Sequence, residues 1–87
     1  MAARAKSSSK GFGDARYRAL IETLVSERKR QGLSQQALAQ KLGRHQQFVS
    51  RYEIGERRLD VVEFADVSKS LGMSAAVLIS ELPAAQS

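Results

Sequence analysis

The sequence contains no cysteine and a single histidine, His45, and these absences exclude several kinds of site. Without cysteine there is no disulfide framework and no thiolate metal site, and one histidine cannot form a histidine cluster. We therefore expect no metal and no cofactor. A cysteine nucleophile and a glycine-rich phosphate loop are also missing, and so short a chain has little room for a deep pocket. The sequence thus argues against an enzyme and against a small-molecule ligand.

Long hydrophobic runs are absent as well. The longest apolar run is Ala75–Ile79, far short of the roughly 20 residues that cross a bilayer. The start of the chain has no apolar stretch that resembles an export signal. The sequence therefore predicts a cytoplasmic protein with no membrane segment.

What the chain does have is an excess of basic residues. It is 87 residues long, which allows one domain, and it carries 14 Lys and Arg against 9 Asp and Glu, a net charge of +5. The charge balance is +5 over residues 1–30, +3 over 31–58 and −3 over 59–87. Such an asymmetry indicates an anionic partner for the basic part and a different role for the acidic part.

Apolar residues recur at helical spacing after residue 13. They lie three or four positions apart and are Tyr17, Leu20, Ile21, Leu24 and Val25. Asp14 is the predicted N-cap of this amphipathic helix, and Gly32 ends it. Residues 1–13, with Arg4, Lys6 and Lys10, lack the periodicity and are expected to form a flexible basic tail.

Two short helices follow. Ser34 is a predicted N-cap for a helix over 35–42, and Gly43 ends it. The next helix is predicted over 46–54, with Gly55 at its end and a charged loop over 56–59. Helices of about two turns are marginal alone, so packing against neighbours must hold them.

The last third of the sequence predicts two further helices. Asp60 and Glu63 have the spacing of a capping box, which begins the first of them. Ser74 begins the other, which Pro83 ends and which contains Val77, Leu78, Ile79 and Leu82. With no persuasive strand, the sequence predicts an all-α fold, a compact five-helix bundle. The predicted divisions are the tail 1–13, the domain 14–82 and a C-terminal tail 83–87.

The stretch 35–52 meets the requirements of a helix-turn-helix, in which two short helices cross at about 90 to 120° through a turn that often contains glycine. Gly43 supplies the turn. One arc of the helix over 46–54 is mostly polar and contains Gln46, Gln47, Ser50, Arg51 and Ile54. Gln pairs with adenine and Arg with guanine in the major groove of double-stranded DNA. The arc either simply faces water or, as the helix-turn-helix pattern favours, reads base edges.

Three segments carry a family resemblance: Leu33–Gly43 (LSQQALAQKLG), Val49–Glu53 (VSRYE) and Gly55–Arg57 (GER). They resemble the phage repressor and Cro-like, or XRE-type, helix-turn-helix transcriptional regulators, over roughly residues 17–82. The resemblance implies a compact five-helix fold that binds an operator as a homodimer, often as a repressor and often at its own promoter. It also implies roles for single residues. Gln46 and Gln47 match the main base-reading positions, Ser50 and Arg51 match further groove-facing positions, and Gln35 matches a phosphate-contacting position.

The sequence departs from the family pattern at two positions. His45 stands where the family usually has a Ser or Thr cap for the recognition helix, and Phe48 stands where the family often has a small polar residue. His45 is a poorer cap. Phe48 is expected in the core, with contact between its edge and a thymine methyl group as the alternative.

Four arginines and one glutamate complete the expected site. Arg28 and Glu53 match a pair with which the family ties the recognition helix to the first helix, a structural role. Arg44, Arg57 and Arg58 match loop positions that flank the groove, and they are candidates for phosphate contacts, unless they are only solvated surface charges.

The last helix allows two interpretations. Val77, Leu78, Ile79 and Leu82 form the dimer interface, or they complete the core of the monomer. The acidic, apolar last third also permits an alternative function. In that case the same fold serves as an antitoxin or accessory subunit whose main role is to bind a protein.

Overall fold

The computed structural model describes residues 14–84, and within this range the regular structure is entirely helical. The helices are α2 (Ala15–Arg30), α3 (Gln35–Leu42), α4 (Gln46–Ile54), α5 (Val61–Ser70) and α6 (Ala75–Ser80). This arrangement confirms the predicted all-α, five-helix class. The predicted basic tail with Arg4, Lys6 and Lys10 lies outside the described residues, as does the end of the predicted C-terminal tail after residue 84.

Local side-chain caps explain where four of these helices begin. The side chains of Asp14, Ser34 and Ser74 each accept a hydrogen bond from a backbone amide in the first turn of the helix that follows. Asp60 and Glu63 form the predicted capping box, each accepting from the other's backbone amide, at 2.7 and 3.0 Å. His45, at the start of α4, makes no side-chain capping bond, in agreement with its description as a poor cap.

The last helix is shorter than predicted. It ends at Ser80, and Leu82 donates its backbone amide to the Ile79 carbonyl in the turn that follows. The prediction that Leu82 belongs to this helix is therefore wrong. Pro83 disfavours helical backbone in the residue before it, so the helix stops earlier than the apolar pattern indicates.

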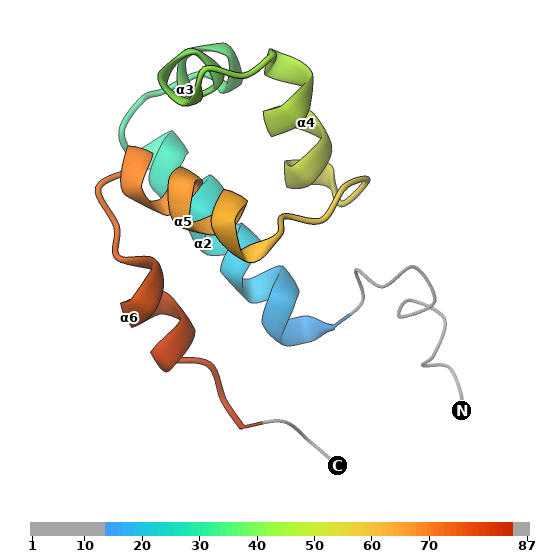
Figure 1. Ribbon diagram of the computed structural model, residues 1–87, viewed down its shortest axis with the longest axis vertical. Helices are drawn as coiled ribbons and strands as arrows, with labels where there is room; N and C mark the ends of the chain where they lie inside the picture. The colour runs from blue at the N-terminus through green and yellow to red at the C-terminus, as the bar shows by residue number, and fades with distance from the viewer. Residues whose placement is uncertain (1–13, 85–87) are drawn as a thin grey trace.

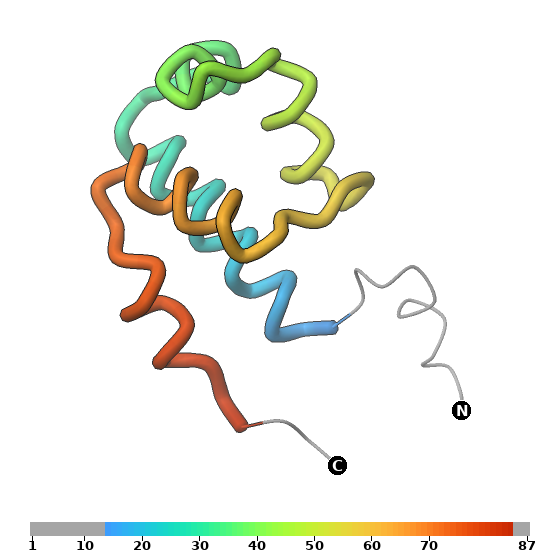
Figure 2. Tube along the Cα trace, in the orientation of Figure 1, coloured from blue at the N-terminus to red at the C-terminus, as the bar shows by residue number. Residues whose placement is uncertain are grey.

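The core lies where the five helices meet. The chain turns sharply between α3 and α4 at one end of the molecule, and α6 follows the C-terminal end of α5 and runs away from α3 and α4 (Figures 1 and 2). α4 packs against both α2 and α3, and α3 also packs against α5. Among the described helices, α6 has its main contact with α5. Each helix from α2 to α5 contributes fully or almost fully buried side chains, among them Ile21, Leu24, Leu38, Ala39, Val49, Tyr52 and Val67. The two short helices are thus held by tertiary packing.

Gly43 ends α3 in the left-handed conformation, with φ 69°, and gives the chain its turn toward α4. An added Cβ would meet no atom within 4 Å, so only backbone strain opposes a side chain here. We expect Gly43→Ala to lower the free energy of unfolding by about 1 kcal/mol. Gly43→Asn should cost less, because Asn tolerates this conformation better. Urea denaturation of both variants measures the difference, and equal losses would contradict the assignment.

Candidate nucleic-acid interface

The helix-turn-helix consists of α3 and α4, joined through Gly43. The inner side of α4 is anchored in the core by Val49 and Tyr52, which are fully buried. Leu38 and Ala39 of α3 are buried with them in the same hydrophobic cluster. The two helices therefore pack as one unit whose outer side is free of core contacts.

The polar arc of α4 faces outward. Gln46, Gln47 and Arg51 are exposed, and Ser50 is half-buried. Ile54, at the end of the same arc, is 64% exposed. The four residues that the sequence predicts as base readers thus lie on the outward side of one helix, and all but Ser50 are exposed.

Arg28 and Glu53 form a buried ion pair between α2 and α4. The Arg28 Nε lies 2.7 Å from the Glu53 Oε2, and its Nη2 lies 2.9 Å from Oε1. The Arg28 Nη1 donates to the Leu33 carbonyl at 2.7 Å. Hydrogen bonding to the Glu53 carboxylate raises the pKa of Arg28. This bidentate pair fixes the distance and the rotation of α4 relative to α2.

Gln35 also bonds to Glu53, which sequence reasoning did not foresee. Its side-chain Nε2 donates to the Glu53 Oε1 at 2.9 Å, and the residue is half-buried. The side-chain amide that the family resemblance assigns to a phosphate therefore faces the protein interior. Ser34 already accepts from the Ala37 amide, so the backbone amides of Gln35 and Gln36 are the donors at this position.

A second unforeseen contact also involves Glu53, through its backbone carbonyl near the C-terminal end of α4. Arg18 of α2 donates from Nη2 to the backbone carbonyl of Glu53 at 3.4 Å and to the Glu22 carboxylate at 3.3 Å. A cation at the C-terminal end of a helix interacts favourably with its dipole. Arg18 thus gives α2 a second hold on α4.

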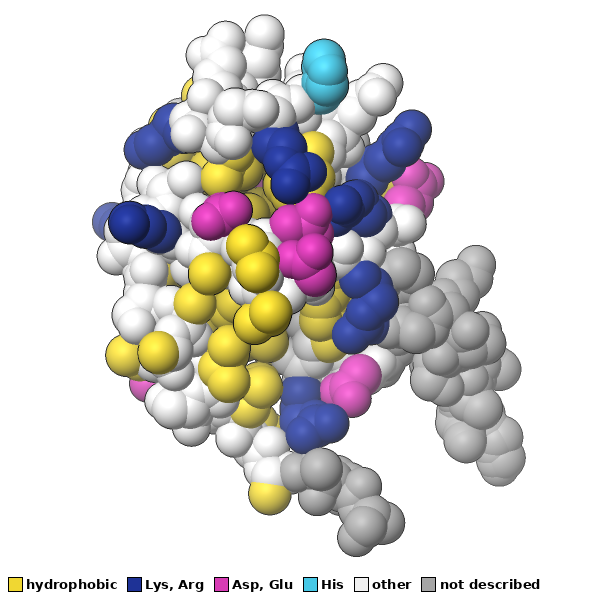
Figure 3. Space-filling model, in the orientation of Figure 1, with side chains coloured by type: hydrophobic (Ala, Val, Ile, Leu, Met, Phe, Trp, Pro, Cys, Tyr) yellow, Lys and Arg dark blue, Asp and Glu magenta, His cyan; other side chains and the backbone are white. Residues whose placement is uncertain are grey.

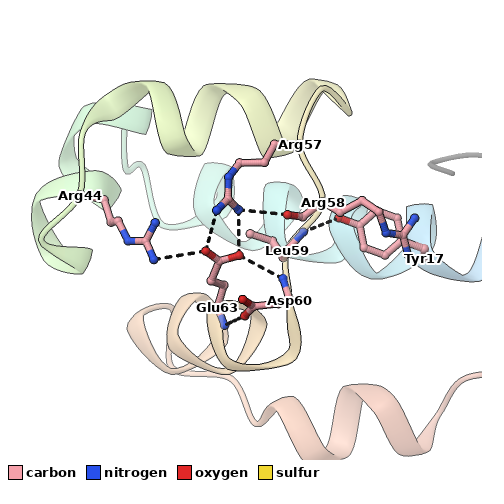
Figure 4. Close-up of polar contacts among 7 residues, drawn as sticks. All are labelled: Tyr17, Arg44, Arg57, Arg58, Leu59, Asp60 and Glu63. Atoms are coloured by element: carbon pink, nitrogen blue, oxygen red, sulfur yellow. Dashed lines mark hydrogen bonds and ion pairs between the residues drawn. The ribbon is translucent and has the colours of Figure 1, made fainter. Parts of the chain in front are cut away.

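Arg44 and Arg57 converge on Glu63, a residue of α5 (Figure 4). Arg57 donates to both carboxylate oxygens at 2.8 Å, and Arg44 donates from Nη2 to Oε2 at 3.3 Å. The bond from Arg57 makes the largest contribution to lowering the pKa of Glu63, to about 2. Both guanidinium groups also lie over the Phe48 ring, at 4.2 Å and 4.9 Å from its centroid.

Phe48 is a core residue. It is only 9% exposed, and its ring meets Tyr52 in an edge-to-face contact with the centroids 5.5 Å apart. Of the two alternatives for this residue, packing in the core is the one that the burial supports.

Arg58 lies on the ring of Tyr17, with its guanidinium carbon 4.0 Å from the centroid. The Tyr17 hydroxyl accepts a hydrogen bond from the backbone amide of Leu59 at 3.0 Å, as Figure 4 shows. These contacts attach the loop after α4 to the first helix. Only the charge of this loop was evident from the sequence.

The apolar residues near the C-terminus do not act as one group. Leu78 is half-buried against the core, and Leu82 is also half-buried, whereas Val77 and Ile79 are 53% and 43% exposed. The core interpretation therefore applies to Leu78, and the dimer interface stays a prediction. Leu78 supports the monomer, and Val77 and Ile79 leave apolar surface exposed.

Within residues 14–84 no three His, Cys, Asp or Glu side chains are grouped so that they could bind a metal ion. No helix in that range is both long and apolar enough to span a membrane.

We expect Glu53→Ala to lower the free energy of unfolding by about 3 kcal/mol, because it leaves the buried Arg28 guanidinium without its counter-charge. Urea denaturation measures the change. Glu22→Ala is the matched control, since this exposed carboxylate bonds weakly to Arg18, and it should change stability by less than about 0.5 kcal/mol. An unchanged unfolding midpoint for Glu53→Ala would refute the structural role of the pair.

Comparison with known proteins agrees with this geometry. The helix-turn-helix family model HTH_3 matches residues 24–78, more than half of the chain. A solved structure of an XRE-family like protein from Pseudomonas syringae pv. tomato str. DC3000 is 42% identical, with a TM-score of 0.75. The alignment covers 87% of this chain and 93% of that one. No curated protein matches. The chain therefore belongs to the XRE-type family of helix-turn-helix DNA-binding regulators.

Proposed function

We propose that this protein is a sequence-specific regulator of transcription, acting as a repressor, that inserts α4 into the major groove of an operator. The observation that carries the proposal is the division of α4 into two sides. Val49, Tyr52 and Glu53 hold one side in the protein, while the exposed side presents amide and guanidinium groups. A helix held in this way presents its side chains to a groove without reorganising.

The outward side chains have the chemistry that base reading needs. Gln46 and Gln47 each offer a donor and an acceptor, which match N7 and N6 of adenine. Arg51 offers paired donors for O6 and N7 of guanine, and the Ser50 hydroxyl bonds to either kind of base edge. The function is one of binding, not of catalysis.

Contacts to the phosphates on either side of the groove position the reader. The candidates are Arg44 in the turn before α4, Arg57 and Arg58 in the loop after it, and the start of α3 at Gln35. Such contacts carry no sequence information, but they make the observed affinity fall steeply with salt concentration. The net charge of +5 supports an anionic partner.

The protein acts as a homodimer in this proposal, with two recognition helices about 34 to 36 Å apart on one face of a roughly palindromic operator. Exposed hydrophobic side chains gather over α5 and α6 (Figure 3). Val61 and Val62 of α5 and Val77 and Ile79 of α6 are among them. We assign Val77, Leu78 and Ile79 of α6 and Leu82 after it to the dimer interface, with Leu78 also packing against the core of its own subunit. In this proposal one operator lies in the protein's own promoter, and the protein acts in the cytoplasm without a small-molecule ligand.

The same exposed hydrophobic surface favours one other function. In this second candidate, α5 and α6 bind a different protein, and the chain is an antitoxin or accessory subunit. The first candidate function predicts that a second copy of this chain covers the hydrophobic surface, and the second predicts that a different protein does. Both predict that α4 binds DNA.

Selection of binding sites from random duplex DNA tests the reading function. We expect a roughly palindromic site, and we expect Gln46→Ala, Gln47→Ala and Arg51→Ala each to lower affinity for it by about 1–3 kcal/mol and to relax the base preference at one position per half-site. Gln40→Ala is the control, because Gln40 is an exposed glutamine of α3 outside the arc, and it should leave the base preferences unchanged. Recovery of no preferred sequence by the wild-type protein would overturn the proposal.

Sedimentation of the full chain, free and bound to the selected duplex, tests the dimer. We expect Val77→Glu to weaken self-association, because it places a charge in an apolar interface. Ile54→Glu is the matched control, since Ile54 is also exposed but lies on α4, and it should leave the free protein's self-association unchanged. A wild-type monomer, both free and on DNA, would contradict the dimer.

A further inference from the structure

We infer that Phe48 and Glu63 are positioning residues that hold Arg44 beside the recognition helix, where Arg44 binds a DNA phosphate. Arg57 has a different role: it fixes the Glu63 carboxylate in place and does not itself bind phosphate. The inference rests on the proposed function. It gives different roles to Arg44 and Arg57, which the sequence presents alike as candidates for phosphate contacts.

Arg44 and Arg57 are alike in position and exposure. Each lies against the Phe48 ring and the Glu63 carboxylate, one just before α4 and the other just after it. Their side chains are 41% and 39% exposed. Exposure therefore does not decide which of them binds a phosphate.

Hydrogen bonding distinguishes the two. Arg57 uses both terminal nitrogens: Nη1 donates to Glu63 and to the Arg58 carbonyl at 3.0 Å, and Nη2 donates to the other oxygen of Glu63. This is the bidentate geometry that fixes an arginine in place. A phosphate would have to displace the carboxylate in order to receive the same donors.

Arg44 makes a single, longer hydrogen bond among the described residues, from Nη2 to Glu63 at 3.3 Å. A guanidinium group has five N–H donors, so most of those on Arg44 are not used within this part of the chain. Its position is nevertheless defined, because the guanidinium carbon lies 4.2 Å from the Phe48 centroid, the shorter of the two arginine contacts with this ring. A cation in this position is attracted by the face of the ring.

Glu63 is well placed to support both roles at once. It is itself buried, and its backbone amide and carboxylate belong to the capping box of α5. Its carboxylate therefore cannot swing away with either arginine. Arg57 balances most of its charge through two short bonds, which leaves Arg44 attached by the weakest contact of the cluster.

Salt titrations of binding to the selected duplex separate the two roles. We expect Arg44→Gln to weaken binding about tenfold and to reduce the slope of log K against log salt by about 0.9 for each bound subunit. Arg57→Gln should leave this slope unchanged and lower the thermal unfolding midpoint by about 5 °C, with binding measured below both midpoints. Equal reductions in slope for the two variants, a reduction for Arg57→Gln alone, or no reduction for either would overturn the inference.

Arg57→Lys provides a second measurement in case Arg57→Gln does not fold. It keeps the charge but loses the bidentate geometry. A brace requires that geometry, so the unfolding midpoint should fall. An unchanged midpoint for Arg57→Lys would contradict the bracing role.

A double-mutant comparison tests Phe48 as the support of Arg44. We expect Phe48→Leu to weaken binding severalfold in the wild-type protein and to have no further effect in Arg44→Gln, because both changes remove the same contact. Additive losses would mean that Phe48 acts independently of Arg44. If the wild-type chain selects no sequence at all, the proposed function fails. If it selects a site but Arg44→Gln keeps the full salt slope, only the positioning role fails.

Discussion

The ion pair between Arg28 and Glu53 is the interaction on which the placement of the recognition helix depends. Both side chains are almost completely buried, so each would be costly without the other. The pair joins α2 to α4, and Gln35 brings α3 to the same carboxylate. Three helices therefore meet at one charged group. The arrangement also turns a negative charge of α4 inward, away from the polyanion that the helix is proposed to meet.

The fold was largely predictable from the sequence, because its signals are local. Asp14, Ser34 and Asp60 cap helices through backbone amides two or three residues away, so their roles follow from sequence spacing alone. Gly43 and Gly55 end α3 and α4 as predicted, and both have positive φ. The prediction failed at Leu82, where apolar spacing outweighed the effect of the proline that follows.

The contacts around α4 were less predictable, because they depend on how distant segments pack. No local rule brings Gln35 to Glu53 or Arg57 to Glu63. The sequence predicted Glu63 only as part of a capping box, and its spacing gave no sign that its carboxylate also accepts hydrogen bonds from Arg57. One signal was available: Arg44 and Phe48 are four residues apart, a spacing at which a cation and a ring can meet near the start of a helix.

The two sides of α4 have separate tasks, and this separation has an evolutionary consequence. Val49, Tyr52 and Glu53 hold the helix, whereas Gln46, Gln47 and Arg51 make no hydrogen bond to another side chain within residues 14–84. Exchanges among exposed polar residues usually alter stability by less than about 0.5 kcal/mol. The outward positions are therefore free to vary without endangering the fold. Under the proposed function, a lineage built on this scaffold can acquire new operators through a few substitutions while its architecture stays intact.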